Sequence, residues 1–129
     1  MFSSTENLSR ETVRDIPLKV LAHLGDAVFH LFERERQVLM IKTASSLHKT
    51  TAASVSAVRQ ADLLDNLAPG LSEEEADIVR RARNIKPSNY RKSGQDAYRK
   101  ATAFEALVGY LYLLDKKRLL TLLNKTLEF

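Results

Sequence analysis

The stretch from Leu18 to Met40, LKVLAHLGDAVFHLFERERQVLM, constrains the fold more than any other part of the chain. Apolar residues cover most of the circumference of this predicted helix, and a helix of that kind is buried on several sides. Asp26 lies near its middle, directly after Gly25. A second apolar stretch, Ala101 to Leu114 (ATAFEALVGYLYLL), carries one isolated carboxylate, Glu105. Burying an unpaired carboxylate costs free energy, so we expect the two acids to share a partner that compensates their charge.

The composition is that of a folded domain. With 129 residues, 44% of them hydrophobic, the chain can bury a core without disulfides, and we expect one domain over residues 1–129, with 1–15 as a short helix or a loosely held arm. The absence of cysteine excludes a thiolate metal site. No apolar run reaches the length of about 18 residues that a membrane helix needs, and the polar N-terminus does not resemble a signal peptide. We therefore expect a cytoplasmic protein without a membrane partner.

The rest of the chain also has a helical pattern. It predicts helices over residues 47–67, with a break near 50–51, over 72–84, over 96–114, which contains the second apolar stretch, and over 118–129, and a loop over 85–95. Ser72 and Glu75 have the spacing of a capping box at the start of the second of these helices. In the helix over 47–67, the residues expected to face the core are Val55, Val58, Leu63 and Leu67. Because no alternating pattern of strands occurs, we predict an all-α fold of about six or seven helices.

Glu105 is expected to lie in a seam between two helices. Ala101 and Gly109 share its helix face, and both are small enough to let another helix come close. Gly25 removes side-chain bulk beside Asp26 in the same way. The two carboxylates could then hold Mg²⁺ or Mn²⁺, because these ions prefer oxygen ligands and Mg²⁺ completes its coordination with waters and substrate phosphates. Spacing alone also allows each acid to pair with a basic group or to face water.

A different metal site is conceivable on the polar strip of the first helix. His23, Asp26 and His30 follow one another at i, i+3 and i+7, and these side chains could in principle bind zinc or iron. The E-x-x-H elements of a di-iron bundle are absent, however, so partly exposed histidines are the simpler interpretation. Other enzyme classes find little support, since the chain has no glycine-rich phosphate loop, no G-x-S-x-G motif and no cysteine nucleophile.

Basic residues gather in one segment of a chain whose formal net charge is only +4. Between residues 80 and 100 Asp96 is the only acid, and the basic residues are Arg80, Arg81, Arg83, Lys86, Arg91, Lys92, Arg99 and Lys100. Such a segment indicates a polyanionic partner, although a solvated surface explains it equally well. Phosphate contacts from this segment would suit the wide minor groove of double-stranded RNA.

Several ordered blocks resemble the ribonuclease III family. LAHLGDAVF (21–29) is similar to the signature helix of that family, and TAFEALVGYLYL (102–113) is similar to its second catalytic helix. The resemblance is closest to the short Mini-III branch, which lacks a double-stranded RNA-binding domain, and it extends to LHKTTAASVSAVRQA (47–61) and RRARNIK (80–86). It implies an all-α endonuclease domain that forms a homodimer, with the RNA duplex in a valley between the subunits.

The resemblance also implies roles for individual residues. Asp26 and Glu105 correspond to a catalytic, metal-binding pair, with Mg²⁺ as the cofactor and Mn²⁺ as a substitute. Ala22 and Thr102 stand where longer ribonuclease III enzymes have two further acids, which agrees with the Mini-III branch and leaves the number of metals open. The implied substrate is the precursor of large-subunit ribosomal RNA, with a ribosomal protein or pre-ribosomal particle as a further partner.

We therefore predict a metal-dependent endoribonuclease that cleaves double-stranded RNA. Because 129 residues leave no room for a separate RNA-binding domain, the catalytic domain must bind the RNA itself, and the candidate contacts are Lys49, Arg81, Arg83, Lys86, Arg91 and Lys92. The competing hypothesis is a non-catalytic helical module that binds structured RNA, which the absence of acids at positions 22 and 102 would support. A helical dimerisation domain without RNA function would leave Glu105 unexplained.

Overall fold

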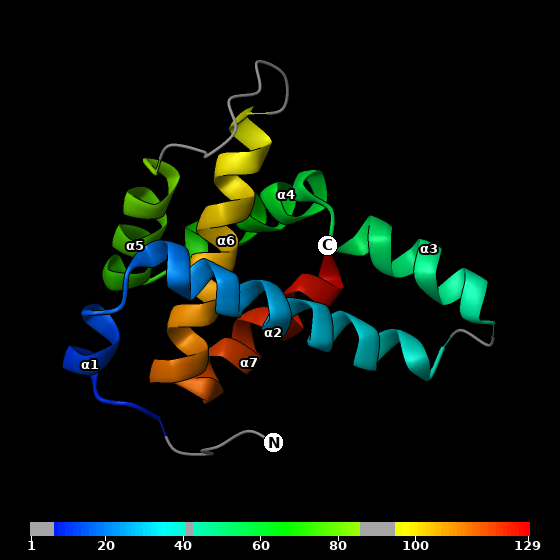
Figure 1. Ribbon diagram of the computed structural model, residues 1–129, viewed down its shortest axis with the longest axis horizontal. Coiled ribbons are helices and arrows are strands. Elements are labelled where there is room, and N and C mark those ends of the chain that lie inside the picture. Colours follow the sequence, from blue (N-terminus) through cyan, green and yellow to red (C-terminus); the bar gives the residue numbers. More distant parts are fainter. Residues whose placement is uncertain (1–6, 41–42, 86–94) are drawn as a thin grey trace.

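The fold consists of helices throughout the part of the chain that the structure describes. The computed structural model describes residues 7–40, 43–85 and 95–129. Its helices are α1 (Arg10–Arg14), α2 (Leu18–Val38), α3 (Ala44–Ser54), α4 (Ala57–Leu67), α5 (Glu73–Arg83), α6 (Gln95–Leu114) and α7 (Lys116–Lys125), with short 3-10 turns at Ala68–Gly70 and Thr126–Glu128 (Figure 1). The predicted all-α class is confirmed. None of these helices combines the length and the apolar character needed to cross a membrane.

Capping residues set the helix boundaries. The predicted capping box is present at α5, where Ser72 Oγ accepts a hydrogen bond from the Glu75 N–H at 3.1 Å and Glu75 Oε1 accepts one from the Ser72 N–H at 2.8 Å. The break expected near 50–51 in the helix over 47–67 lies further along the chain, because Ser56 caps a new helix, α4. It also begins earlier, at Ala44, after the N-cap Thr43. The loop expected over 85–95 lies outside the described residues except for its two ends.

α6 is the central helix of the fold. It is buried along most of its length from Ala101 to Leu111, with α2 crossing over it and α4 and α5 packed on its other sides (Figure 1). The expectation that α2 is buried on several sides is wrong. Val20, Leu31 and Val38 of α2 are 54%, 43% and 61% exposed. At 100° per residue these three side chains lie on one stripe, opposite the face that packs on α6.

The segment before α2 is fastened to α5 and α6. Val13 of α1 is fully buried. Arg10 Nε donates a hydrogen bond to Glu74 of α5 at 2.9 Å, and the hydroxyl of the buried Tyr110 of α6 donates a hydrogen bond to the same carboxylate. The Arg10 guanidinium and the Tyr110 hydroxyl hold the pKa of Glu74 below its ordinary value. The ionised Glu74 carboxylate thus connects α1, α5 and α6 on the side of α6 that lies away from α3.

Candidate active site

Two glycines allow α2 and α6 to cross in backbone contact. A Cβ atom at Gly25 would lie 1.7 Å from the carbonyl oxygen of Glu105, and one at Gly109 would lie 2.0 Å from the carbonyl oxygen of Leu21. Side-chain carbons cannot come so close, so only glycine fits at either position without a shift of the helices. The close approach expected from these two glycines is therefore present.

The crossing brings the two isolated carboxylates together. Asp26 follows Gly25 on α2, and its side chain is hydrogen-bonded to that of Glu105 on α6. One turn further along α2, the fully buried rings of Phe29 and Phe104 meet edge to face with centroids 4.9 Å apart, which fixes the two helices at this level. The Asp26 side chain is 52% exposed whereas Glu105 is only partly exposed, so the pair opens to solvent on the Asp26 side.

The surroundings of Glu105 favour its neutral form. Burial, the hydrogen bond with Asp26 and the negative charge of Asp26, in that order, raise the pKa of Glu105 to about 8. At neutral pH its carboxyl group therefore keeps its proton and donates a hydrogen bond to the Asp26 carboxylate. A cation between the two groups would favour loss of that proton, because it removes the repulsion between two ionised carboxylates. Oxygen donors of this kind fit Mg²⁺ or Mn²⁺.

His30 also contacts this pair, although not as part of the zinc or iron site that its sequence position suggested. Its Nε2 atom lies 3.1 Å from Asp26 Oδ1, one helical turn away. His23 is exposed, and in the described ranges no three His, Asp or Glu side chains gather closely enough to hold a metal ion. The zinc or iron alternative is therefore wrong. The i, i+4 spacing of Asp26 and His30 was the sequence signal for their contact.

The basic segment between residues 80 and 100 is described only in part. Arg81 and Arg83 are exposed at the C-terminal end of α5. Arg81 Nε donates a hydrogen bond to Asp77 at 3.1 Å, and Arg83 Nη2 lies 3.8 Å from Asp96 Oδ1. Both arginines therefore have acidic neighbours at the protein surface. The other candidates from this segment lie outside the described residues: Lys86, Arg91 and Lys92.

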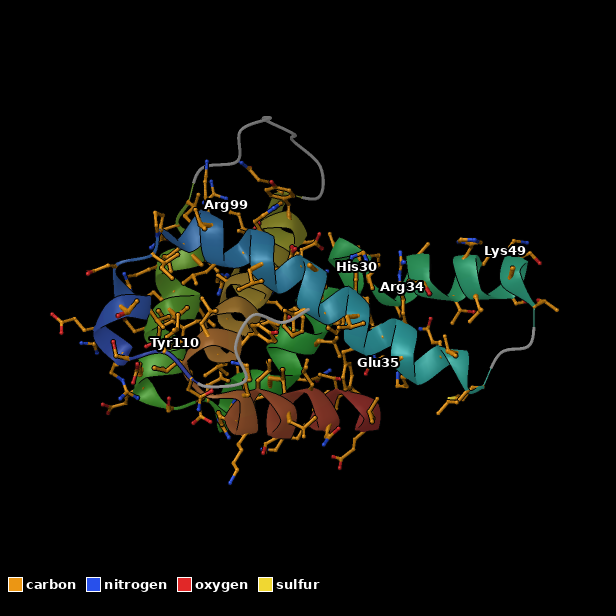
Figure 2. The ribbon with its side chains drawn as sticks, turned by 60° about the horizontal axis from the view of Figure 1, so that its bottom comes forward. His30, Arg34, Glu35, Lys49, Arg99 and Tyr110 are labelled. Carbon is orange, nitrogen blue, oxygen red and sulfur yellow. The ribbon has the colours of Figure 1, made fainter. Side chains whose placement is uncertain are left out.

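Lys49 belongs to a second basic surface, formed by α2 and α3. Arg34 of α2 and His48 of α3 line a groove of about 200 Å³ between these helices. Figure 2 shows Lys49 on the same edge of the molecule as Arg34 and His30. The sequence did not single out Arg34, because it lies 15 positions before Lys49 and only the packing of α3 on α2 brings the two helices together.

Known proteins match this chain in both sequence and fold. Residues 19–116 match the Ribonuclease III domain family. The chain is 45% identical over 117 residues to Mini-ribonuclease 3 of Gloeobacter violaceus, which covers 91% of this chain and 87% of the relative. The chain belongs to the Mini-ribonuclease 3 branch of the ribonuclease III family. It is also 46% identical over 112 residues to Mini-ribonuclease 3 of a Thermoanaerobacter species, covering 85% of this chain and 79% of that one.

The fold agrees with this assignment. A crystal structure of a Fusobacterium nucleatum protein is similar with a TM-score of 0.81 at 32% sequence identity, covering 90% of this chain and 95% of the other. The resemblance found in the sequence is thus confirmed, and the protein is an endoribonuclease of the ribonuclease III type. Membership of this family implies a divalent metal and a double-stranded RNA substrate. The hypothesis of a non-catalytic RNA-binding module is wrong.

Proposed function

We propose that Asp26 and Glu105 are the catalytic residues and that they hold Mg²⁺, or Mn²⁺ in its place, for cleavage of double-stranded RNA. The observation that carries this proposal is the hydrogen-bonded pair of carboxyl groups at the glycine crossing, with the pKa of Glu105 raised to about 8. A bound divalent metal supplies positive charge that makes water a better nucleophile and offsets the charge developing on the scissile phosphodiester.

The surrounding residues keep the two carboxyl groups in place. Glu105 lies on the buried central helix, and binding of a cation beside it would favour loss of its proton to solvent. Asp26 presents its carboxylate toward solvent, where RNA can approach, and His30 restrains one of its oxygens at 3.1 Å. Gly25 keeps the backbones of α2 and α6 in contact, so the two residues that carry the carboxyl groups stay at the same level of the crossing.

Charge-removing, shape-preserving substitutions test these roles. We expect Asp26→Asn and Glu105→Gln to fold and to bind an RNA duplex but not to cleave it with Mg²⁺. Asp62→Asn, at an exposed acid on α4, is the matched control and should cleave like the unmodified protein. Undiminished cleavage by Asp26→Asn would refute the assignment.

We further propose that the substrate in the cell is the precursor of large-subunit ribosomal RNA, and that the protein meets it on a pre-ribosomal particle or with a ribosomal protein. The support is the similarity to the Mini-ribonuclease 3 branch. Cells that lack the protein should accumulate a precursor with uncut ends, and the unmodified protein, but not Asp26→Asn, should restore the mature ends. Mature ends in the depleted cells would exclude this substrate.

The protein is also proposed to act as a homodimer. The exposed apolar stripe of Val20, Leu31 and Val38 continues into a groove of about 260 Å³, which Leu31 lines together with Tyr112 of α6 and Leu120 of α7. An apolar surface of this kind favours a protein partner. A two-fold pairing would bury the same stripe on both chains and provide two sites for the two strands of a duplex.

A further inference from the structure

α3 is held on the rest of the molecule mainly by polar side chains. Within α3, which the structure describes in full, only Thr51 is buried. Its hydroxyl donates a hydrogen bond to Gln37 Oε1 of α2 at 2.6 Å. The amide nitrogen of Gln37 in turn donates to Ser54 Oγ at 2.8 Å. One buried α2 side chain therefore holds two points of α3, one turn apart.

Gln37 is itself restrained by a buried acid. Its Nε2 atom lies 3.4 Å from Oε2 of Glu33, a residue that is only 2% exposed. The Arg36 guanidinium donates to the same oxygen at 3.0 Å and 2.5 Å. Buried polar groups that lose a partner cost more than the hydrogen bond contributes, so these groups resist rearrangement. We call Glu33, Gln37, Thr51 and Ser54 the polar lock.

The seam beside the polar lock is not closely packed. The groove of about 200 Å³ that contains Arg34 and His48 runs between α2 and α3 at this point, and Thr51 also lines it. Apolar contact is non-directional, whereas hydrogen bonds weaken steeply when their angle changes. The angle at which α3 leaves the body of the molecule therefore depends on the polar lock.

We propose that the polar lock positions α3 so that Lys49, together with Arg34 of α2, contacts the phosphates of the RNA duplex. This inference rests on the proposed function. Lys49 and Arg34 lie along one edge of the molecule with His30, the neighbour of Asp26 (Figure 2). A rigid duplex can meet charges on two helices at once only if the helices keep a fixed angle. Gln37 and Thr51 are thus positioning residues, which act through Lys49.

The substitution Thr51→Val tests this role, because it keeps the shape of the side chain and removes the donor to Gln37. We expect weaker binding of a perfect RNA duplex, a higher KM and an unchanged kcat at saturating RNA. The slope of log Kd against log salt should fall by about 1, as for Lys49→Ala, because one phosphate contact is lost. Thr51→Ser, which keeps the donor, should restore both values.

The matched control is Thr121→Val on α7, whose hydroxyl donates to the carbonyl of Lys117 in its own helix at 3.1 Å. It should leave binding, KM and the salt slope unchanged. The decisive comparison is a double-mutant cycle: Lys49→Ala should weaken binding in the unmodified protein but add little to Thr51→Val. If Thr51→Val does not fold, Ser54→Ala weakens the polar lock from its other end and takes its place in the cycle.

Two results would overturn the inference. An unchanged salt slope in Thr51→Val would show that the polar lock only stabilises the fold, and fully additive effects of Thr51→Val and Lys49→Ala would show that α3 is not positioned by it. Failure of the proposed function can be distinguished from failure of this inference, because the unmodified protein would then not cleave the duplex in the presence of Mg²⁺.

Discussion

Glu75 and Glu105 show how the neighbours of a glutamate decide its protonation. Glu75 of α5 is buried but accepts hydrogen bonds from the Arg118 guanidinium at 2.8 Å, which holds its pKa below the ordinary value. Glu105 instead faces Asp26, and burial together with that acid raises its pKa to about 8. The same residue type is therefore ionised in a structural ion pair and protonated in the candidate active site.

At the scale of this residue, we expect the metal-free protein to lose stability as the pH rises from about 5 to about 9. Glu105 has an ordinary pKa of 4.5 in the unfolded chain and a pKa of about 8 in the folded one, so the folded state binds more protons between these values. Its stabilising contribution is complete below pH 4.5 and is lost as the pH passes 8. Urea denaturation in EDTA measures the effect.

Glu105→Gln is the matching variant for this experiment, because its side chain stays neutral at every pH. Its stability should change less with pH than that of the unmodified protein over the same range. The acids with lowered pKa values, such as Glu74 and Glu75, titrate below this window and affect both proteins alike. An identical pH profile for the two proteins would show that Glu105 is ionised in the folded state.

At the scale of elements, the crossing of α2 and α6 determines both the fold and the site. We expect Gly25→Ala to destabilise the protein by about 1–3 kcal/mol, because the new Cβ meets the backbone of Glu105 and forces the helices apart. Gly70→Ala is the control, since its Cβ would meet only the end of the flexible Lys125 side chain at 3.6 Å. Equal denaturation midpoints for the two variants would contradict the backbone contact between α2 and α6.

Local signals explain how far the sequence predicted these elements. Capping residues and apolar periodicity act within a few residues, so α2, α5 and α6 were predicted close to their observed bounds. The close crossing of α2 and α6 was also predictable from the sequence, because Gly25 and Gly109 are small residues in apolar helices near the two acids. The exposure of individual α2 side chains was not predictable in this way, since it depends on which helices pack against them. Glu33 is buried beside Gln37, which is hydrogen-bonded to Ser54 of α3, whereas Val20 stays exposed.

The same limit applies to α4 and to the contacts of the site. Val58 was expected to face the core but is 64% exposed, whereas Leu63 and Leu67 of the same helix are buried. An isolated carboxylate in an apolar helix indicated that Glu105 needs a partner, and the glycines indicated where. The i, i+4 spacing of Asp26 and His30 allowed their contact, but a single sequence does not specify the rotamers that make it, nor the helix packing that groups Arg34 with His48.

At the scale of the whole molecule, the charged and apolar surfaces are neighbours that meet at Val38, which lines the groove between α2 and α3 together with Arg34 and His48. Arg99 of α6, His30 and Arg34 of α2 and Lys49 of α3 lie along one edge (Figure 2). The other members of the apolar stripe of α2, Val20 and Leu31, are exposed opposite the face that packs on α6. A duplex can therefore meet the charged edge while another protein surface covers the stripe around Val20 and Leu31.

The proposed dimer predicts that a charge in the apolar stripe separates the subunits. Leu31→Glu should fold but sediment as a monomer, because a carboxylate at the centre of a two-fold interface lies close to its own copy and loses its hydration. Val58→Glu places the same charge at an exposed apolar position of α4 and should leave the dimer intact. The Leu31→Glu monomer should also lose coordinated cutting of both strands. A dimer that persists in Leu31→Glu at micromolar concentration would move the interface away from the α2 stripe.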